Sequence, residues 1–209
     1  MRINFQNMGE KKIKALKVLL FLVALTPLAR LIGWTLLDNL GANPIEKLLR
    51  QTGYWSLTFL TLTLTLTPIR QWTGLIWMGR FRRMLGLFAF FYAIVHLGIY
   101  VILDQYFDWT GILKDISKRP YITIGFTSFM LMVPLALTST DAMIRKLGGH
   151  RWRKLHRLTY VINLGGITHF WWLVKRDTRE PLIFASIYSV SMLLRFFVSQ
   201  RNLKKRQTA

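Results

Sequence analysis

The chain has 209 residues, of which 52% are hydrophobic and 14% aromatic, and its formal net charge is +20. A soluble domain of this length could not hide so much apolar surface around one core, so the composition predicts a membrane protein. The sequence contains no cysteine, which excludes disulfides, cysteine-ligated iron–sulfur clusters and cofactors attached through a C-x-x-C-H motif.

Six apolar stretches approach or exceed the ~18 residues typical of a membrane-spanning helix. They cover residues 17–37, 54–68, 84–103, 120–138, 155–174 and 181–199. The second is the shortest, and its alternating Leu and Thr would also suit a β-strand. Its neighbours have helical length, and threonine hydroxyls can bond to carbonyls of the preceding turn, so a helix is predicted here too. The expected fold is all-α: one integral membrane domain over residues 1–209, with six transmembrane helices.

The segment GANPIEKLLRQTG, between the first two stretches, carries signals for a short helix. Asn43 is a suitable N-cap, Pro44 suits the first helical position, and Glu46 stands at the third. Gly53 would then end the helix as a C-terminal glycine. These signals predict a small separate helix on the outer membrane surface.

The positive charge is concentrated in alternate connections between the apolar stretches. If the N-terminus is cytoplasmic, the cytoplasmic segments hold 20 basic and two acidic residues, and the outer loops hold eight basic and seven acidic ones. The remaining basic residue is Arg30, inside the first stretch. This positive-inside pattern predicts that both termini are cytoplasmic. Topology and contact with membrane lipid account for the charge, and no motif supports binding of nucleic acid.

Histidines are the main candidates for chemistry, because the apolar stretches lack carboxylates, which argues against an ion transporter. At ~1.5 Å per residue, His96 lies about 18–20 Å up the third stretch when counted from Arg83, and His169 lies about 18 Å up the fifth when counted from Arg157. Two imidazoles at matching depth on parallel helices predict axial ligation of a b-type haem. The alternative is that each histidine packs against a neighbouring helix or lines a pore. Zinc suits the pair poorly, since no thiolate or carboxylate accompanies them.

His156 lies about 20 Å below His169 and about 140° away around an ideal helix, so it faces a different partner. A partner for His156 would sit about thirteen residues before His96, a spacing taken from that between His156 and His169. That position holds Arg82 or Arg83, so a complete second bis-histidine site is not predicted. His156 is an additional candidate haem ligand, and the two arginines are candidates for binding an inner-side haem propionate, flavin phosphate or quinone carbonyl. The alternative role of the arginines is positive-inside anchoring. His150 is predicted to be an interfacial loop residue.

Arg30 lies roughly 20 Å into the first stretch, at the depth of His96 and His169. A buried arginine needs a counterion, and no acidic side chain lies in the apolar stretches. A haem propionate would supply one, so Arg30 is a candidate propionate partner. The alternative is that the side chain extends to the outer membrane surface.

Seven segments of the chain resemble the ferric-reductase-like transmembrane superfamily and, within it, the MsrQ (YedZ) family. The resemblance covers roughly residues 11–200, and the segments are GANPIEKLLRQTG, LTPIR, RFRRMLGLFAFFYAIVHLGIY, KRPYITIGFTSFM, LALTST, KLGGHRWRKLHRLTYV and THFWW. It implies a multi-pass protein of the bacterial inner membrane that binds haem b, in one or two copies, and FMN. It also implies that His96 and His169 are axial ligands and that His156 is an additional one.

The family resemblance further implies a role in electron transfer. The expected donor is the quinone pool or a cytosolic flavin reductase, and the expected acceptor is a periplasmic molybdopterin-containing catalytic subunit that reduces methionine sulfoxide in oxidised proteins. Larger relatives append flavin and nicotinamide domains, so the donor is expected to be a separate molecule. The chain would carry electrons rather than hold the methionine-sulfoxide active site. The alternative is a haem-free membrane scaffold or transporter, which a missing Soret band would reveal.

Overall fold

The computed structural model describes residues 9–174 and 177–207, and every regular element within them is helical. In chain order these are α1 (Glu10–Leu36), α2 (Pro44–Thr73), η1 (Ile76–Phe81), α3 (Arg82–Ile99), η2 (Tyr100–Asp104), α4 (Trp109–Lys118), α5 (Pro120–Leu137), α6 (Asp141–Leu147), α7 (Gly149–Leu155), α8 (Leu158–Leu173) and α9 (Arg179–Gln207). The all-α class is therefore confirmed for the described residues. Arg2, Lys175 and Arg176, which enter the charge count above, lie outside them.

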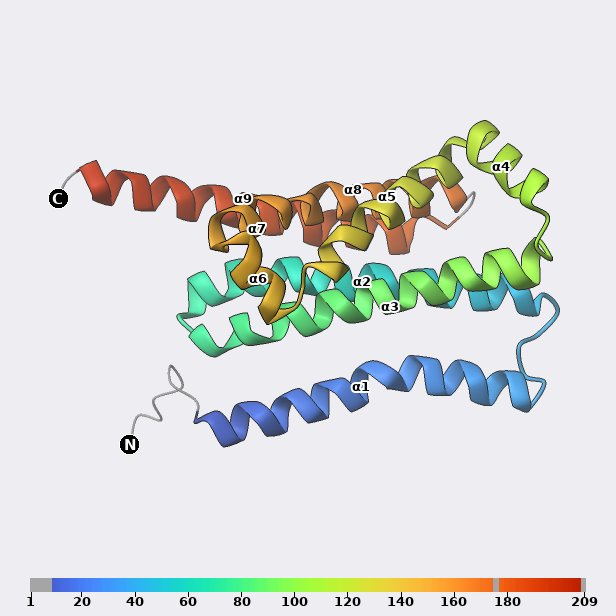
Figure 1. The fold of residues 1–209 in the computed structure, drawn as a ribbon, viewed down its shortest axis with the longest axis horizontal. Coiled ribbons are helices and arrows are strands. Elements are labelled where there is room, and N and C mark those ends of the chain that lie inside the picture. Colours follow the sequence, from blue (N-terminus) through green and yellow to red (C-terminus); the bar gives the residue numbers. More distant parts are fainter. Residues whose placement is uncertain (1–8, 175–176, 208–209) are drawn as a thin grey trace.

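The long helices run side by side along the longest axis of the molecule (Figure 1). α2 and α3 are antiparallel neighbours, and α8 packs against α5, α2 and α9. Helices α6 and α7, the start of α1 and the end of α9 gather at one end, which we call the basic end. Its name comes from the basic residues of α6 and α7, which are Arg145, Lys146, Arg151, Arg153 and Lys154. The opposite end carries α4 and is called the α4 end.

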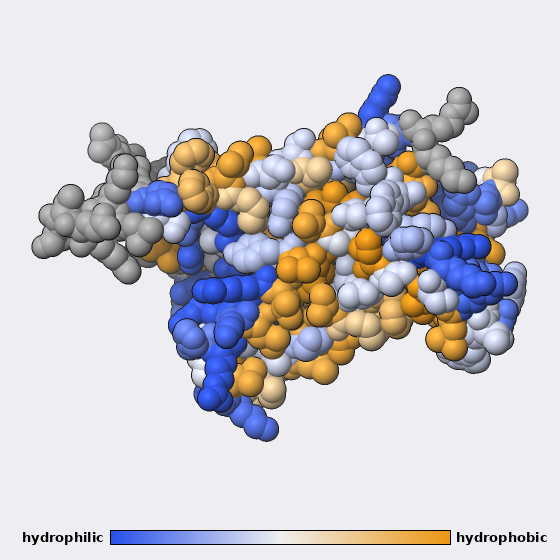
Figure 2. All heavy atoms as spheres, turned by 90° about the horizontal axis from the view of Figure 1, so that it is seen from above, coloured by the Kyte–Doolittle hydropathy of each residue, from blue (hydrophilic) through white to orange (hydrophobic). Residues whose placement is uncertain are grey.

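Four helical segments among the described residues are long and apolar enough to cross a membrane. They are Glu10–Leu36, Ile76–Asp104, Pro120–Leu137 and Arg179–Gln200. The other two expected spans correspond to the threonine-rich α2 and to α8, which has only 16 residues. On the face seen in Figure 2, hydrophilic side chains cluster at the two ends, and mostly apolar and weakly polar ones fill the band between them. These features are those of a membrane protein.

Helix α2 begins as the sequence predicts but does not end where expected. The side chain of Asn43 accepts a hydrogen bond from the Glu46 amide at 3.3 Å, and Pro44 occupies the first helical position. The predicted stop at Gly53 is wrong, because α2 continues to Thr73 and ends at Gly74, in the left-handed conformation. The expected short outer helix is therefore the first part of one 30-residue helix.

The alternating Leu and Thr of residues 60–67 lie on this helix, as expected. Threonine hydroxyls satisfy their hydrogen bonds within α2: Thr58 donates to the Tyr54 carbonyl and Thr63 to the Phe59 carbonyl, both at 2.8 Å. Since these hydroxyls bond to the preceding turn, they can be buried without an external partner.

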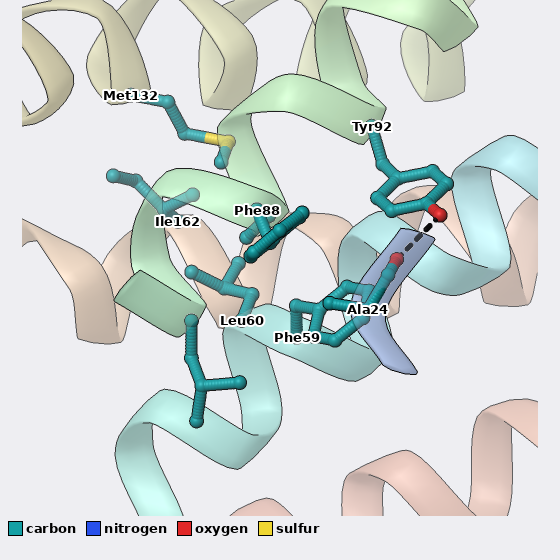
Figure 3. Packing of buried hydrophobic residues seen from close by; sticks show 9 residues of the cluster. Ala24, Phe59, Leu60, Phe88, Tyr92, Met132 and Ile162 are labelled. Atoms are coloured by element: carbon teal, nitrogen blue, oxygen red, sulfur yellow. Dashed lines mark hydrogen bonds between the residues drawn. The ribbon is translucent and has the colours of Figure 1, made fainter. Parts of the chain in front are cut away.

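The core joins α1, α2, α3, α5 and α8 through one apolar cluster (Figure 3). Its labelled members are Ala24, Phe59, Leu60, Phe88, Tyr92, Met132 and Ile162. Tyr92 is fully buried, and its hydroxyl donates to the Ala24 carbonyl at 2.8 Å and accepts from the Leu28 amide at 3.2 Å. The hydroxyl thus lies between a donor and an acceptor one turn apart in α1, next to Pro27, which lacks an amide donor of its own.

Candidate functional site

His96 on α3 and His169 on α8 face each other near the α4 end. Their ring centroids are 6.3 Å apart and the ring planes are inclined by 83°. A metal between two imidazoles, with metal–nitrogen bonds of about 2 Å and ring centres about 1 Å behind each nitrogen, separates the centroids by about 6 Å. The structure thus brings together the two histidines that the sequence placed at matching depth, at a separation that suits one metal ion between them.

Each of the two imidazoles directs its Nδ1 atom at a backbone carbonyl oxygen. Nδ1 of His96 lies 2.9 Å from the Leu49 carbonyl oxygen, and Nδ1 of His169 lies 2.7 Å from the Tyr121 carbonyl oxygen. A carbonyl oxygen only accepts, so Nδ1 carries the proton in each ring and Nε2 keeps a free lone pair. Metal-ligating histidines typically have this second hydrogen bond, which fixes the tautomer and the ring orientation.

Each imidazole also rests on a glycine, one helical turn beyond its carbonyl partner. Gly53 follows Leu49 by four residues in α2, and Gly125 follows Tyr121 by four in α5. A Cβ on Gly53 would lie 3.2 Å from Nδ1 of His96, and one on Gly125 would lie 2.7 Å from Nδ1 of His169. The close approach of the His96 ring explains why Gly53 stands inside α2 rather than at its end.

The pair can supply two nitrogen ligands and no more. Among the described residues, no group of three or more His, Cys, Asp or Glu side chains is placed to hold a metal ion. A metal ion bound by His96 and His169 would therefore take its remaining ligands from a cofactor or from water. An iron porphyrin fits this donor set, because its macrocycle supplies four nitrogens and leaves two axial positions.

A second site is a cavity of about 670 Å³ at the basic end, which we call the basic-end cavity. Its basic and histidine lining residues are Arg82, Arg83, His150, Arg153, Lys154, His156, Arg157 and Arg195. Its apolar lining residues include Leu60, Leu87, Phe90, Met132, Leu135 and Ile162, and no acidic residue lines it. The cavity thus combines an apolar wall with a strongly basic one, and it brings together His156, Arg82 and Arg83, which the sequence linked.

His156 differs in placement from the sequence-based expectation. It follows α7 and precedes α8, so it lies in a turn rather than on a helix shared with His169. The angle of 140° expected from a continuous helix therefore does not apply. The ring stacks on Trp152 with centroids 3.9 Å apart, and Nδ1 lies 3.1 Å from the Trp152 carbonyl oxygen. Nε2 lies 3.4 Å from the Ser139 hydroxyl.

The arginines of the basic-end cavity have different partners. Arg83 forms an ion pair with Asp141, and this guanidinium holds the pKa of the Asp141 carboxyl below its usual range. Arg195 donates from Nη1 to the Tyr160 hydroxyl at 2.8 Å and from Nη2 to the Leu64 carbonyl at 2.6 Å. Arg82 has no ion pair with a described acidic residue.

Sequence reasoning missed Arg195 and Tyr160, because the positive-inside rule already accounted for a basic residue near the end of the last span. One signal was available: Pro68 lacks the amide that would bond the Leu64 carbonyl, so this carbonyl needs another donor. Arg195 provides it.

Arg30 is exposed, and its Nη2 lies 3.5 Å from Oε1 of Gln51. Its guanidinium also lies over the Trp34 ring, 4.6 Å from the centroid. No described acidic residue forms an ion pair with Arg30. Gln51 precedes Gly53 by two residues, so Arg30 contacts the part of α2 that also contacts His96.

Comparison with known proteins gives two independent results. Residues 52–167 match the family model for the ferric reductase like transmembrane component. A protein of Herminiimonas arsenicoxydans is 51% identical over 184 residues, which are 87% of this chain and 84% of that protein. One of Ralstonia nicotianae is 47% identical, covering 88% and 86%, and one of Xanthomonas oryzae is 46% identical, covering 92% of both chains.

All three relatives are named protein-methionine-sulfoxide reductase heme-binding subunit MsrQ. The match extends over most of each chain, and the family model covers both the α2 and the α8 parts of the bundle. The chain belongs to the MsrQ family, within the ferric-reductase-like transmembrane proteins.

Proposed function

We propose that the chain is the haem-b-binding membrane subunit of a protein-methionine-sulfoxide reductase, with His96 and His169 as axial ligands. The relative arrangement of these two imidazoles, 6.3 Å apart with both Nδ1 atoms bonded to carbonyls, carries the proposal. The name shared by the relatives supports it. When bound, haem b supplies one-electron oxidation and reduction of its iron.

The chain's own share of the chemistry is ligation, orientation and burial. The Leu49 and Tyr121 carbonyls hold the Nδ1 protons and make Nε2 of each ring a better donor to iron. Gly53 and Gly125 leave room for the rings to lie against α2 and α5. Arg30 is the proposed partner of a haem propionate, because it has no described acidic partner and its contact, Gln51, lies in the part of α2 that contacts His96.

For the topology, we propose six membrane spans, formed by α1, α2, α3 with η2, α5, α8 and α9, in the bacterial inner membrane. The basic end, with both termini, would face the cytoplasm, as the charge distribution favours. His96 and His169 would then lie toward the periplasm. The basic-end cavity would lie toward the cytoplasm, where a donor could reach it.

This orientation supports the remainder of the electron route. The proposed donor is the quinone pool or a cytosolic flavin reductase, and the proposed acceptor is a periplasmic molybdopterin-containing catalytic subunit. The basic-end cavity, with His156, Arg82 and Arg83, is the proposed site of an inner carrier, either FMN or a second haem. An inner carrier is needed because the hydrocarbon core is about 30 Å thick.

The proposal is tested by haem and flavin stoichiometry on detergent-purified protein, together with His96→Ala and His169→Ala. Each substitution should remove the main haem absorbance while the protein still inserts in the membrane. His150→Ala, in α7, is the matched control and should keep the absorbance of the haem on His96 and His169. Full reduced-minus-oxidised spectra in both ligand variants would refute the ligand assignment. A purified wild-type protein without a Soret band would favour the haem-free scaffold or transporter.

A further inference from the structure

Two arginines of the basic-end cavity stand out because no described side chain neutralises them. Arg82 begins α3 and Arg195 lies on α9, yet both line the same cavity. Neither forms an ion pair with a described acidic residue, and Nε of each has no hydrogen-bond partner among the described residues. Arg83 differs, since Asp141 already compensates its charge.

Arg195 is held in place by neutral groups alone. Pro68 leaves the Leu64 carbonyl without its usual helical donor, and Nη2 of Arg195 bonds to that carbonyl at 2.6 Å. Nη1 bonds to the Tyr160 hydroxyl at 2.8 Å. A guanidinium has five N–H donors, so these two bonds fix its orientation and leave donors free for a ligand.

Two unneutralised guanidiniums in this cavity carry a cost in free energy unless an anion binds between them. No acidic side chain lines the cavity, and four further cationic side chains do, namely Arg83, Arg153, Lys154 and Arg157. Like charges in a partly buried site repel, and an isolated buried charge is expensive to desolvate. A pair of planar guanidiniums also suits the binding of phosphate or carboxylate through several hydrogen bonds.

We infer that Arg82 and Arg195 together bind the dianionic group of a flat redox cofactor whose rings occupy the apolar wall of the basic-end cavity. The group is a phosphomonoester or a pair of carboxylates, so it comes from FMN or from haem propionates. Phe90, Met132 and Leu135 are on the apolar wall. Tyr160 and the Leu64 carbonyl act as positioning groups for Arg195. The inference deepens the proposed function by naming the residues that recognise the inner carrier.

The test compares charged ligands with uncharged counterparts in detergent-purified protein. One arm titrates FMN against riboflavin, which lacks the phosphate, and follows flavin fluorescence. The other arm titrates haem against its dimethyl ester, which lacks the carboxylates, and follows absorbance. The wild-type protein should prefer the charged member of one pair by about tenfold or more, as charge-assisted hydrogen bonds require. The pair that shows the preference identifies the source of the anion.

Arg82→Gln and Arg195→Gln should each lose most of that preference while keeping affinity for the uncharged ligand. Arg151→Gln is the matched control, because Arg151 is exposed in α7, carries the same charge and does not line the cavity. Tyr160→Phe should weaken the preference in the same direction, since it frees Nη1 of Arg195 with little change in volume. A preference that survives in both arginine variants, or that is absent from both arms in the wild type, would overturn the inference.

The absorbance of the haem on His96 and His169 reports separately whether each variant is folded. If Arg195→Gln loses that absorbance, Arg82→Gln and Tyr160→Phe decide the question. If the wild type binds no haem but discriminates FMN from riboflavin through the arginines, the proposed function fails and the arginine assignment stands.

Discussion

The ring of His169 packs so closely on Gly125 that a Cβ at that position would lie 2.7 Å from Nδ1. His96 repeats the arrangement on Gly53, with 3.2 Å to Nδ1. Both glycines stand four residues after the carbonyl that the histidine bonds, so two unrelated helix pairs use one local geometry. The orientation of both imidazoles therefore depends on two positions that carry no functional group.

Gly125→Ala should lower haem content more than Gly53→Ala does. The added methyl on Gly125 lies closer than real Cβ contacts allow, so it must displace the His169 ring, whereas the contact on Gly53 needs only a small shift. Haem per protein and the reduced-minus-oxidised spectrum measure the effect. Gly33→Ala is the control, since no atom lies within 4 Å of its added Cβ. Unchanged haem content in Gly125→Ala would mean that the ring orientation is not needed for ligation.

His156→Ala should keep the absorbance of the haem on His96 and His169 but slow its reduction from the basic end. The reason is that His156 lines the basic-end cavity and lies in the turn before α8, away from the other pair. Stopped-flow reduction of protein in vesicles, with donor added on one side, measures the rate. His150 lines the same cavity, so His150→Ala serves as the comparison. Equal rates in His156→Ala and wild type would count against an inner relay.

Tyr92→Phe should destabilise the protein by about 1–3 kcal/mol, the usual cost of leaving buried polar groups unpaired. The lost hydroxyl is the partner of the Ala24 carbonyl and the Leu28 amide. Unfolding in mixed detergent, followed by circular dichroism, measures the change. Tyr54→Phe in α2 is the control, because it removes a tyrosine hydroxyl that does not bond to the main chain of α1. Equal stability of the two variants would show that α1 closes its own hydrogen bond without Tyr92.

The ion pair between Arg83 and Asp141 should make a small, pH-dependent contribution to stability. Arg83 lowers the pKa of Asp141 in the folded state, so the contribution is present above the unfolded pKa of about 3.9 and disappears as the pH falls through the folded value. The difference in unfolding midpoint between wild type and Asp141→Asn, measured from pH 7 downward, should stay constant to about pH 4 and then shrink. If the difference in unfolding midpoint grew as the pH fell, the pair would not stabilise the folded protein in the way proposed.

The helical class and the meeting of His96 with His169 could be predicted because both depend on simple periodic quantities. Apolar length indicated membrane-spanning helices, and four helical segments of the described residues have the length and composition to cross a membrane. A constant rise per residue predicted matching depth for the two histidines. Depth alone does not set the separation of the two rings, because that separation also depends on the carbonyl and glycine contacts of each imidazole.

The rest depended on tertiary contacts that local signals do not contain. Gly53 has the sequence context of a helix end, yet its role is to admit the His96 ring. The fifth apolar stretch looks continuous, but α7 ends at Leu155, the chain turns at His156, whose ring stacks on Trp152, and α8 starts only at Leu158. Arg195 was explained adequately by membrane topology, and the sequence shows only that Pro68 leaves the Leu64 carbonyl without a donor, not that Arg195 supplies one.

The insertion of Tyr92 into α1 has a consequence for the first helix. The hydroxyl contacts two main-chain atoms, which every residue except proline can offer at those positions. These two hydrogen bonds are therefore indifferent to the identity of the α1 side chains, although Ala24 also packs in the core. Apolar residues such as Val18, Leu19 and Leu22, which point outward, are free to be replaced to match the thickness or composition of the surrounding bilayer while the helix stays docked.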